Sequence, residues 1–390
     1  MIERTIAPVL KSLAAQYPVV TVTGPRQSGK TTLCRKVFPE KEYVNLESPD
    51  TRQFALSDPR GFLARFPDGA ILDEIQRAPQ LLSYIQPIVD ERRIASQYIL
   101  TGSQQFEVLD TVNQSLAGRT ALLKLLPLSM AELKSSRLLP ATDRLLLTGF
   151  YPRIYDQGLD PTQALGDYFE TYVERDIRQL IAIKDLSLFE RFVKLCAGRV
   201  GQILNLQSLG NDAGISHTTA RAWLTLLEAS YVVFVLQPWH GNFSKRQIKS
   251  PKLYFYDVGL ASYLLGLENE LHVSRDPLRG NLFENMAVME ALKYRFNRGR
   301  RNNLHFYRDS KGNEVDLLVE IGPDVFPLEI KAGATITQDY FKGLKHFAKC
   351  MSGLPWGGGL VYGGEEVQLR SDVRIYPATD IHELLQSLEG

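Results

Sequence analysis

The residue pattern in this sequence that is best suited to chemistry lies close to its N-terminus. Residues 24–31 fit the pattern G-x-x-x-x-G-K-[ST] at every position. In such a loop, glycines let backbone N–H groups surround phosphate oxygens, the lysine reaches the β- and γ-phosphates, and the last hydroxyl holds Mg²⁺. We therefore predict a nucleotide site with Thr31 as a metal ligand. The predicted binding residues are Gly24, Pro25, Arg26, Gln27, Ser28, Gly29, Lys30, Thr31 and Thr32.

A pair of acids further along the chain suits the same chemistry. The apolar run at residues 70–72 predicts a buried strand, and Asp73 and Glu74 follow it directly. After a phosphate-binding loop, the first acid of such a pair holds Mg²⁺ through its water shell, and the second polarises the attacking water. We predict that Asp73 binds metal and nucleotide and that Glu74 is catalytic. Solvated acids at a strand end are the alternative.

Two more polar positions could complete a hydrolytic site. The apolar run at residues 97–100 predicts a further strand, and Thr101, Ser103 and Gln104 at its end could sense the γ-phosphate or align the water. Arg119 could act on the nucleotide of its own chain, or as an arginine finger on the nucleotide of a neighbouring subunit. An arginine finger that acts in trans requires a homo-oligomer, for example a ring. A surface cation is the alternative for Arg119.

A second set of candidate residues lies near the C-terminus. Residues 304–307, 313–319 and 325–331 predict three strands, the last two forming a hairpin. Glu329 and Lys331 are two residues apart on a strand and share one face, and Asp316 lies on the preceding strand. With Glu284 from a predicted helix, Asp316 and Glu329 could bind a divalent metal while Lys331 stabilises charge. An inactive ion-pair network of the same residues is the alternative.

The middle of the chain shows the outline of a DNA-binding module. Residues 206–216 predict a helix, a tight turn and Ser216 as the N-cap of a helix over 217–228. Strands predicted at 231–236 and 252–256 would complete a winged helix, which binds either DNA or a protein partner. The predicted DNA-contacting residues are Thr218, Thr219 and Arg221 on the second helix and Lys245, Arg246 and Lys249 between the strands.

The composition limits the classes of protein to which this chain could belong. The formal net charge of its 390 residues is +1, so a nucleic-acid surface would have to be local. Three widely separated cysteines indicate a reducing compartment rather than a disulfide framework. Neither an apolar run of about 18 residues nor the apolar core of a signal peptide is present. We therefore expect a cytoplasmic protein without a membrane partner.

Several motifs together resemble a known family. The segments GPRQSGKTT, ILDEIQ, ILTGSQQ, SLAGR and LLPLSMAEL are similar to those of an AAA+-type ATPase family of bacteria and archaea, whose C-terminal domain has no assigned function. The resemblance extends through residues 149–152 and 168–176, although Phe150 replaces a usual glycine. It implies an α/β nucleotide-binding core, ATP and Mg²⁺. The order Glu284, Asp316, Glu329-x-Lys331 resembles the PD-(D/E)xK nucleases, including archaeal Holliday junction resolvases, with Val315 replacing the variable proline of that name.

These expectations combine into one architecture of the α/β class. We predict a P-loop AAA+ ATPase core at residues 1–135, a helical connector at 136–185, a winged-helix middle domain at 186–270 and a restriction-endonuclease-like α/β C-terminal domain at 271–390. The expected function is ATP hydrolysis coupled to branch migration, remodelling or cleavage of DNA, including branched DNA. The alternative is an ATP-dependent switch that binds a protein partner through a catalytically inactive nuclease-like domain.

Overall fold

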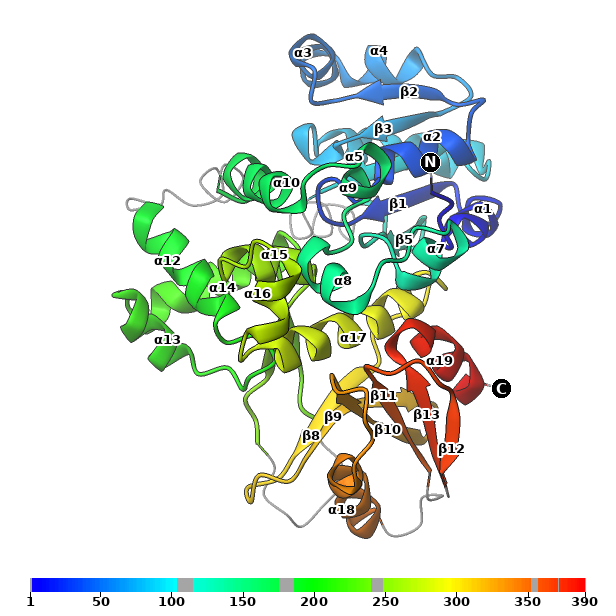
Figure 1. The fold of residues 1–390 in the computed structure, drawn as a ribbon. Coiled ribbons are helices and arrows are strands. Elements are labelled where there is room, and N and C mark those ends of the chain that lie inside the picture. Colours follow the sequence, from blue (N-terminus) through cyan, green and yellow to red (C-terminus); the bar gives the residue numbers. More distant parts are fainter. Residues whose placement is uncertain are drawn as a thin grey trace. The chain divides into compact units, whose positions relative to one another are not determined.

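The computed structural model describes residues 2–103, 115–174, 186–239, 248–351, 357–370 and 372–389. The contacts between its residues divide the chain into two compact units. Figure 1 labels helices and strands of both. The first unit comprises Met1–Leu128, Ala229–Tyr231 and Phe296–Arg300, and the second comprises Ser129–Glu228, Val232–Arg295 and Arg301–Gly390. Two short segments from the second half of the chain therefore belong with the N-terminal unit. The predicted Gln104, Lys245 and Arg246 lie outside the described residues.

The first unit is built on a parallel five-stranded sheet, to which the strands predicted at residues 70–72 and 97–100 belong. Its spatial order is β2-β3-β4-β1-β5. Parallel pairing places the carboxyl ends of all five strands at one edge, which is where ligands bind in such sheets. The strands are β1 (Val19–Thr23), β2 (Glu42–Asn45), β3 (Ala70–Asp73), β4 (Tyr98–Gly102) and β5 (Thr120–Lys124).

Helices cover both faces of this sheet and bury a separate apolar cluster on each. One cluster joins Leu10 of α1 and Leu33 of α2 to alternate residues of β1, and the other joins α4 and α5 to the opposite face. The amphipathic pattern of residues 1–17 predicts a helix, and the structure forms one over the shorter range Ala7–Ala14. The helices are α1 (Ala7–Ala14), α2 (Lys30–Val37), α3 (Pro49–Ser57), α4 (Pro59–Ala64) and α5 (Leu81–Arg92), with a 3-10 turn η1 (Ile75–Arg77).

The second unit begins with helices and a small β-hairpin. Its strands β6 (Val233–Leu236) and β7 (Lys252–Phe255) pair antiparallel, and both lie within the strands predicted at residues 231–236 and 252–256. Within the predicted helical connector, the sequence pattern of residues 168–183 predicts one long helix. Phe169–Glu174 form a π-helix directly after α10, and residues 175–183 lie outside the described residues. The helices are α7 (Met130–Ser135), α8 (Thr142–Thr148), α9 (Pro152–Gln157), α10 (Pro161–Tyr168), α12 (Leu186–Ala197), α13 (Leu206–Ala213), α14 (His217–Ala229), α15 (Val258–Leu264), α16 (Glu270–Arg275) and α17 (Arg279–Phe296).

The C-terminal part of the second unit is a six-stranded mixed sheet with the order β12-β13-β11-β10-β9-β8. The antiparallel hairpin of β9 and β10 confirms the predicted pair of strands, and β11 and β13 extend the sheet in parallel. The strands are β8 (Leu304–Arg308), β9 (Glu314–Ile321), β10 (Asp324–Lys331), β11 (Gly358–Tyr362), β12 (Gln368–Arg370) and β13 (Val373–Pro377), and the helices are η3 (Gln338–Phe341), α18 (Lys342–Cys350), η4 (Ala378–Asp380) and α19 (Ile381–Glu389).

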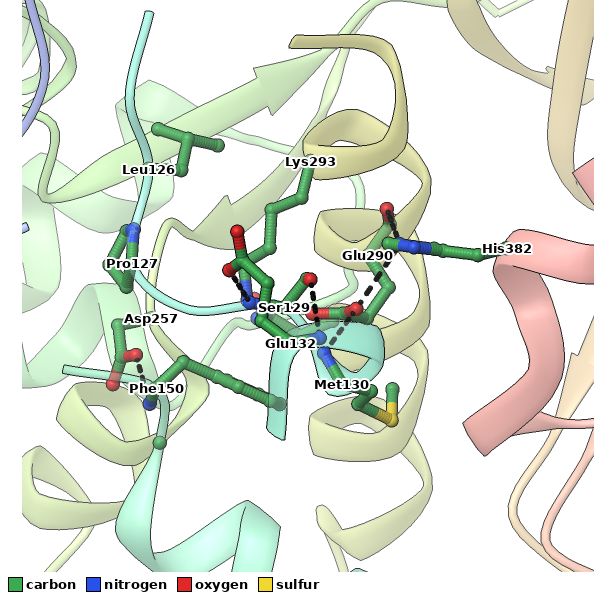
Figure 2. A network of polar contacts seen from close by, with 12 residues as sticks. Leu126, Pro127, Ser129, Met130, Glu132, Phe150, Asp257, Glu290, Lys293 and His382 are labelled. Carbon is green, nitrogen blue, oxygen red and sulfur yellow. Dashed lines mark hydrogen bonds and ion pairs between the residues drawn. The ribbon is translucent and has the colours of Figure 1, made fainter. Parts of the chain in front are cut away.

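A buried polar network ties three helices of the second unit together (Figure 2). Glu290 of α17 is fully buried and forms an ion pair of 2.7 Å with Lys293, one turn further on. Its second carboxylate oxygen accepts a hydrogen bond of 2.8 Å from the Met130 backbone N–H at the start of α7. His382 of α19 lies 3.3 Å from the same oxygen. The network fixes α7 and α19 against α17.

Candidate nucleotide site and acid–lysine cluster

The predicted phosphate-binding loop connects β1 to α2. Gly24 has φ 152°, and a Cβ there would lie 2.0 Å from the carbonyl oxygen of Leu125, the residue that follows β5, so only glycine fits at this position. Gly29 adopts φ 92° immediately before α2. Lys30 Nζ donates hydrogen bonds to the carbonyl oxygens of Gly24 (3.0 Å) and Pro25 (2.8 Å). Burial lowers the pKa of Lys30, although the carboxylates of Glu74 and Asp73 oppose this shift.

Asp73 ends β3 beside this loop, as predicted. Its carboxylate accepts a hydrogen bond of 2.9 Å from the Thr31 hydroxyl and one of 2.7 Å from the Tyr43 hydroxyl, and Thr101 donates a further one. Thr31 and Asp73 thus bring together a hydroxyl and a carboxylate, which are oxygen ligands that suit Mg²⁺. Tyr43 lies on β2 and has no place in the sequence motifs, so motif reasoning missed it.

Glu74 is held in an unusual backbone conformation at the same edge. Its φ of 57° places a non-glycine residue in the left-handed region. Its Oε2 accepts hydrogen bonds from Ser103 Oγ (2.9 Å) and from Gln76 Nε2. Burial alone would raise the pKa of Glu74, but the positive charges of Lys30 and Arg26 outweigh it and hold the pKa below its ordinary value. Ser103 was predicted for this site, whereas Gln76 was not.

The remaining loop residues surround the same site. Arg26 lies 3.4 Å from the Glu47 carboxylate, Gln27 adopts φ 60°, and Thr32 is exposed on α2. The Ser28 hydroxyl is buried and finds no hydrogen-bond partner among the described residues. A buried donor of this kind next to a phosphate-binding loop suits a phosphate oxygen.

Two residues far away in the sequence support the loop. The Arg4 guanidinium donates to the backbone oxygens of Ser28 (2.6 Å) and Leu126 (2.7 Å). The hydroxyls of Tyr231 and Thr23 share a hydrogen bond of 3.0 Å, one residue before Gly24. Neither support belongs to a motif. The apolar pattern around Tyr231 predicts only a strand. The sequence therefore does not show that Tyr231 belongs to the nucleotide-binding unit.

Arg119 lies at the opposite edge of the sheet. It immediately precedes β5, where Thr120 pairs with Val19, the first residue of β1. The phosphate-binding loop follows the other end of β1, five residues or about 16 Å away. Arg119 instead forms an ion pair of 2.5 Å with Asp90. The structure therefore does not bring Arg119 to the phosphate-binding loop of its own chain, and its role in trans stays a prediction.

In the second unit, three of the predicted C-terminal residues meet. Lys331 Nζ lies 2.7 Å from Asp316 Oδ2 and 2.6 Å from Glu329 Oε2. The Ile330 backbone N–H also donates to Asp316, at 2.8 Å. Burial and the neighbouring Asp316 raise the pKa of Glu329 to about 9, whereas the charge of Lys331 helps to hold the pKa of Asp316 below its ordinary value. The two acids therefore share one proton at neutral pH.

Glu284 belongs to a second group beside this one. Its carboxylate accepts hydrogen bonds from Lys252 Nζ (2.8 Å) and from the Tyr254 hydroxyl (2.5 Å), both on β7. Lys252 also pairs with Glu314, which sequence reasoning did not select. Burial raises the pKa of Glu284, and the negative charge of Asp316 adds to this shift while Lys252 opposes it.

The predicted metal site of Glu284, Asp316 and Glu329 is not assembled. No group of three or more His, Cys, Asp or Glu side chains within the described ranges is placed to hold a metal ion. The physical reason is that Lys331 lies between Asp316 and Glu329, while Lys252 and Tyr254 bind Glu284. The C-terminal acids are therefore neutralised by side chains of the protein itself.

The helices α13 and α14 have the predicted turn between them. Ser216 accepts a hydrogen bond of 3.1 Å from the Thr219 backbone N–H, which confirms the N-cap, and the two hydroxyls lie 2.9 Å apart. Thr218 and Arg221 are exposed on α14, and Lys249 is exposed just before β7. The interaction of these side chains with DNA stays a prediction.

Comparison with known proteins places these sites in a family. Residues 16–134 match the AAA domain, residues 140–271 match a domain of unknown function (DUF8612), and residues 279–381 match another, DUF4143. Two relatives are the uncharacterized proteins Rv2008c of Mycobacterium tuberculosis (strain ATCC 25618 / H37Rv) and Mb2031c of Mycobacterium bovis (strain ATCC BAA-935 / AF2122/97). Each is 33% identical over 337 residues, which is 85% of this chain and 74% of the relative.

The chain belongs to the family of these two mycobacterial proteins. Its first unit is an AAA-type P-loop ATPase domain. Among the described residues, none of the helices combines the length and the apolar character that crossing a bilayer requires.

Solved structures of ATPases resemble the chain only weakly. The Walker-type ATPase PABY2304 of Pyrococcus abyssi shares 14% identity, with a TM-score of 0.43, over 66% of this chain and 94% of that chain. AMPPCP-bound DnaA from Aquifex aeolicus shares 18% identity, with a TM-score of 0.30, over 57% of this chain and 85% of that chain. The assignment rests on the AAA domain match and on the parallel sheet with its phosphate-binding loop.

Proposed function

We propose that the first unit hydrolyses ATP with Glu74 as the general base. The observation that carries this proposal is the placement of Glu74. It follows directly on Asp73, which is hydrogen-bonded to Thr31, and its Oε2 is held by Ser103 and Gln76. Fixing one carboxylate oxygen orients the other to take a proton from water. The lowered pKa keeps Glu74 ionised at neutral pH, as a base requires.

The residues of the loop fit MgATP. Mg²⁺, when bound, supplies charge stabilisation at the β- and γ-phosphates. The Thr31 hydroxyl and the Asp73 carboxylate would hold the ion. The Lys30 ammonium rests on two loop carbonyl oxygens and can turn from them to the phosphates. The buried Ser28 hydroxyl is a further donor for a phosphate oxygen.

ATP turnover and nucleotide affinity, measured separately, test this proposal. Lys30→Ala should weaken binding of a fluorescent ATP analogue, because it removes a charge from the phosphates. Glu74→Gln should keep that affinity and slow phosphate release by about 10²-fold or more. Glu42→Gln, an exposed acid on β2, is the matched control and should leave both unchanged. A Glu74→Gln variant that turns over at the wild-type rate would remove Glu74 from the catalytic role.

We further propose that ATP turnover drives the handling of DNA, including branched DNA, by the second unit. Helix α14 carries the exposed Thr218 and Arg221, and Lys249 is exposed near β7. We propose a winged-helix fold for α12 to β7 and a nuclease-like fold for the C-terminal sheet. Support for the latter is the meeting of Asp316, Glu329 and Lys331 on one hairpin.

The DNA proposal is tested by binding and by salt dependence. Changing Lys245, Arg246 and Lys249 together to alanine should weaken binding of duplex and four-way DNA alike. The slope of log affinity against log salt should fall by about 0.9 for each phosphate that the altered side chains no longer neutralise. ATPase rates with and without duplex, single-stranded and four-way DNA then test the coupling. Undetectable DNA binding by the intact chain at low salt would contradict the proposal.

A second candidate function is favoured by the ion pairs of the C-terminal acids. Because Lys331, Lys252 and Tyr254 neutralise these acids, the second unit could instead bind a protein partner while ATP acts as a switch. Nicking assays on linear, flapped and four-way DNA with Mg²⁺ or Mn²⁺ separate the two functions. Cleavage that Asp316→Ala abolishes while ATP hydrolysis persists favours a nuclease. Absence of cleavage by wild type favours the switch.

A further inference from the structure

Lys252 is an unusual residue for a β-hairpin strand, because its side chain is 2% exposed and lies among acids. Its ammonium group donates to Glu284 at 2.8 Å and also pairs with Glu314. The negative charge of Asp316 acts on it as well. A buried ammonium group is costly unless carboxylates surround it, so this lysine and these acids depend on each other.

The strand that carries Lys252 is docked firmly on the helix that carries Glu284. Lys252 and Tyr254 are two residues apart on β7 and share one face, and both bind Glu284. The next residue on α17, the buried Asn285, accepts a hydrogen bond from the Phe255 backbone N–H (2.6 Å) and donates one to the Phe255 carbonyl (3.0 Å). Side-chain and backbone interactions therefore fix β7 at the acid cluster.

The charges in this region are already close to balance. The acids are Glu284, Glu314, Asp316 and Glu329, and the cations that pair with them are Lys252, Lys331 and Arg308. Each of the four acids thus lies within ion-pair distance of at least one of these three cations. A divalent cation that entered this region would meet the ammonium of Lys252 at close range, where repulsion is strong because the site is buried.

We propose that Lys252 is an internal cation that takes the place of a divalent metal ion beside Glu284 and Glu314, so that the β6–β7 hairpin closes the C-terminal acid cluster against metal. Metal binding at these acids then requires displacement of β7. This inference deepens the second candidate function, in which the nuclease-like fold does not cut DNA. It makes Lys252 a positioning residue that acts on the acids and not on a substrate.

Manganese binding to the nucleotide-free full-length chain, followed by electron paramagnetic resonance, tests the inference. Lys252→Met keeps a side chain of similar length without its charge. This variant should bind one Mn²⁺ more than wild type, at least about tenfold more tightly than wild type binds any ion in this region. Lys252→Met combined with Glu284→Gln should lose the added ion. Lys134→Met, which removes an exposed lysine paired with Asp380, is the control and should behave as wild type.

The outcomes separate this inference from the proposed ATPase, because ATP hydrolysis is read independently and should stay unchanged in every variant. A folded Lys252→Met variant that gains no Mn²⁺ would overturn the inference. Near-UV circular dichroism establishes folding. If Lys252→Met fails to fold, wild type and Glu284→Gln decide the question. Equal Mn²⁺ binding by these two supports the internal cation, and an ion that wild type binds and Glu284→Gln loses overturns it.

Discussion

The buried ion pair of Glu290 and Lys293 offers a sharp test of how the second unit is held together. We expect Glu290→Ala to lower the free energy of unfolding of this unit by about 3–5 kcal/mol. The side chains of Glu290 and Lys293 are 0% and 1% exposed. The substitution removes the carboxylate 2.7 Å from the Lys293 ammonium, and removing one partner of a buried ion pair is strongly destabilising because it weakens the compensation of the charge that stays buried.

One neighbouring interaction adds to this magnitude. The Met130 backbone N–H loses its acceptor, which costs about 1–3 kcal/mol when the donor is buried. The Phe150 ring, whose centroid lies 3.6 Å from Lys293 Nζ, contacts this ammonium in wild type and variant alike, so it does not change the difference in stability between them (Figure 2). The lost Met130 acceptor therefore places the expected loss in the upper part of the range.

Urea unfolding, followed by tryptophan fluorescence, measures this loss, because all three tryptophans of the sequence, Trp223, Trp239 and Trp356, fall within the ranges of the second unit. The double variant Glu290→Leu with Lys293→Met should recover most of the stability, since it removes both charges. Glu383→Ala, at an exposed pair 3.8 Å from Lys134, is the control and should change stability by less than about 0.5 kcal/mol. A loss below about 1 kcal/mol for Glu290→Ala, or a double variant no more stable than Glu290→Ala, would refute the reasoning.

Acidity adds an independent check on Glu290. Burial alone would raise its pKa, but Lys293 and His382 outweigh burial and hold it below the ordinary value of 4.5. A lowered folded-state pKa means that the stabilisation is present above pH 4.5 and is lost as the pH falls through the folded-state value. Wild type should therefore lose stability in that acid range, and Glu290→Gln should lose less.

Three further predictions concern other parts of the chain. The stability of wild type should fall as the pH rises from 4.5 to about 9, because the raised pKa of Glu329 makes the folded state bind a proton that the unfolded state releases. Glu329→Gln should remove this fall, and identical pH profiles of wild type and variant would contradict the prediction. Arg119→Ala should reduce ATP turnover without changing nucleotide affinity, and mixing it with Lys30→Ala should restore some activity if the finger acts in trans; a fully active monomer by light scattering would exclude that role. Tyr231→Phe should destabilise the first unit by about 1 kcal/mol through loss of the Thr23 hydrogen bond, measured by thermal unfolding with and without nucleotide; an unchanged midpoint would show that this bond adds nothing.

The sequence by itself determined the parts of this protein whose chemistry is local. The phosphate-binding loop, Asp73 and Glu74 at the end of β3, and the hairpin that brings Asp316 to Lys331 all follow from short patterns. In each case the geometry of one strand or one turn fixes the relative positions of residues that are close in the sequence. The Ser216 cap is of the same kind, because its hydrogen bond reaches only three residues along the chain.

Only the tertiary structure decided which distant segments meet. Gln76 and Ser103 meet at Glu74 because β3 and β4 are neighbours in the sheet, and Arg119 is remote from the loop because β5 starts at the opposite edge. Lys252 binds Glu284, which lies 32 residues further along the chain. Tyr231 binds Thr23, which lies 208 residues before it and belongs to the nucleotide-binding unit. Sequence periodicity indicates that such residues are buried, but it does not show which residues they contact. Only the packing of separate elements decides those contacts, and here it places the acids of a predicted metal site in ion pairs.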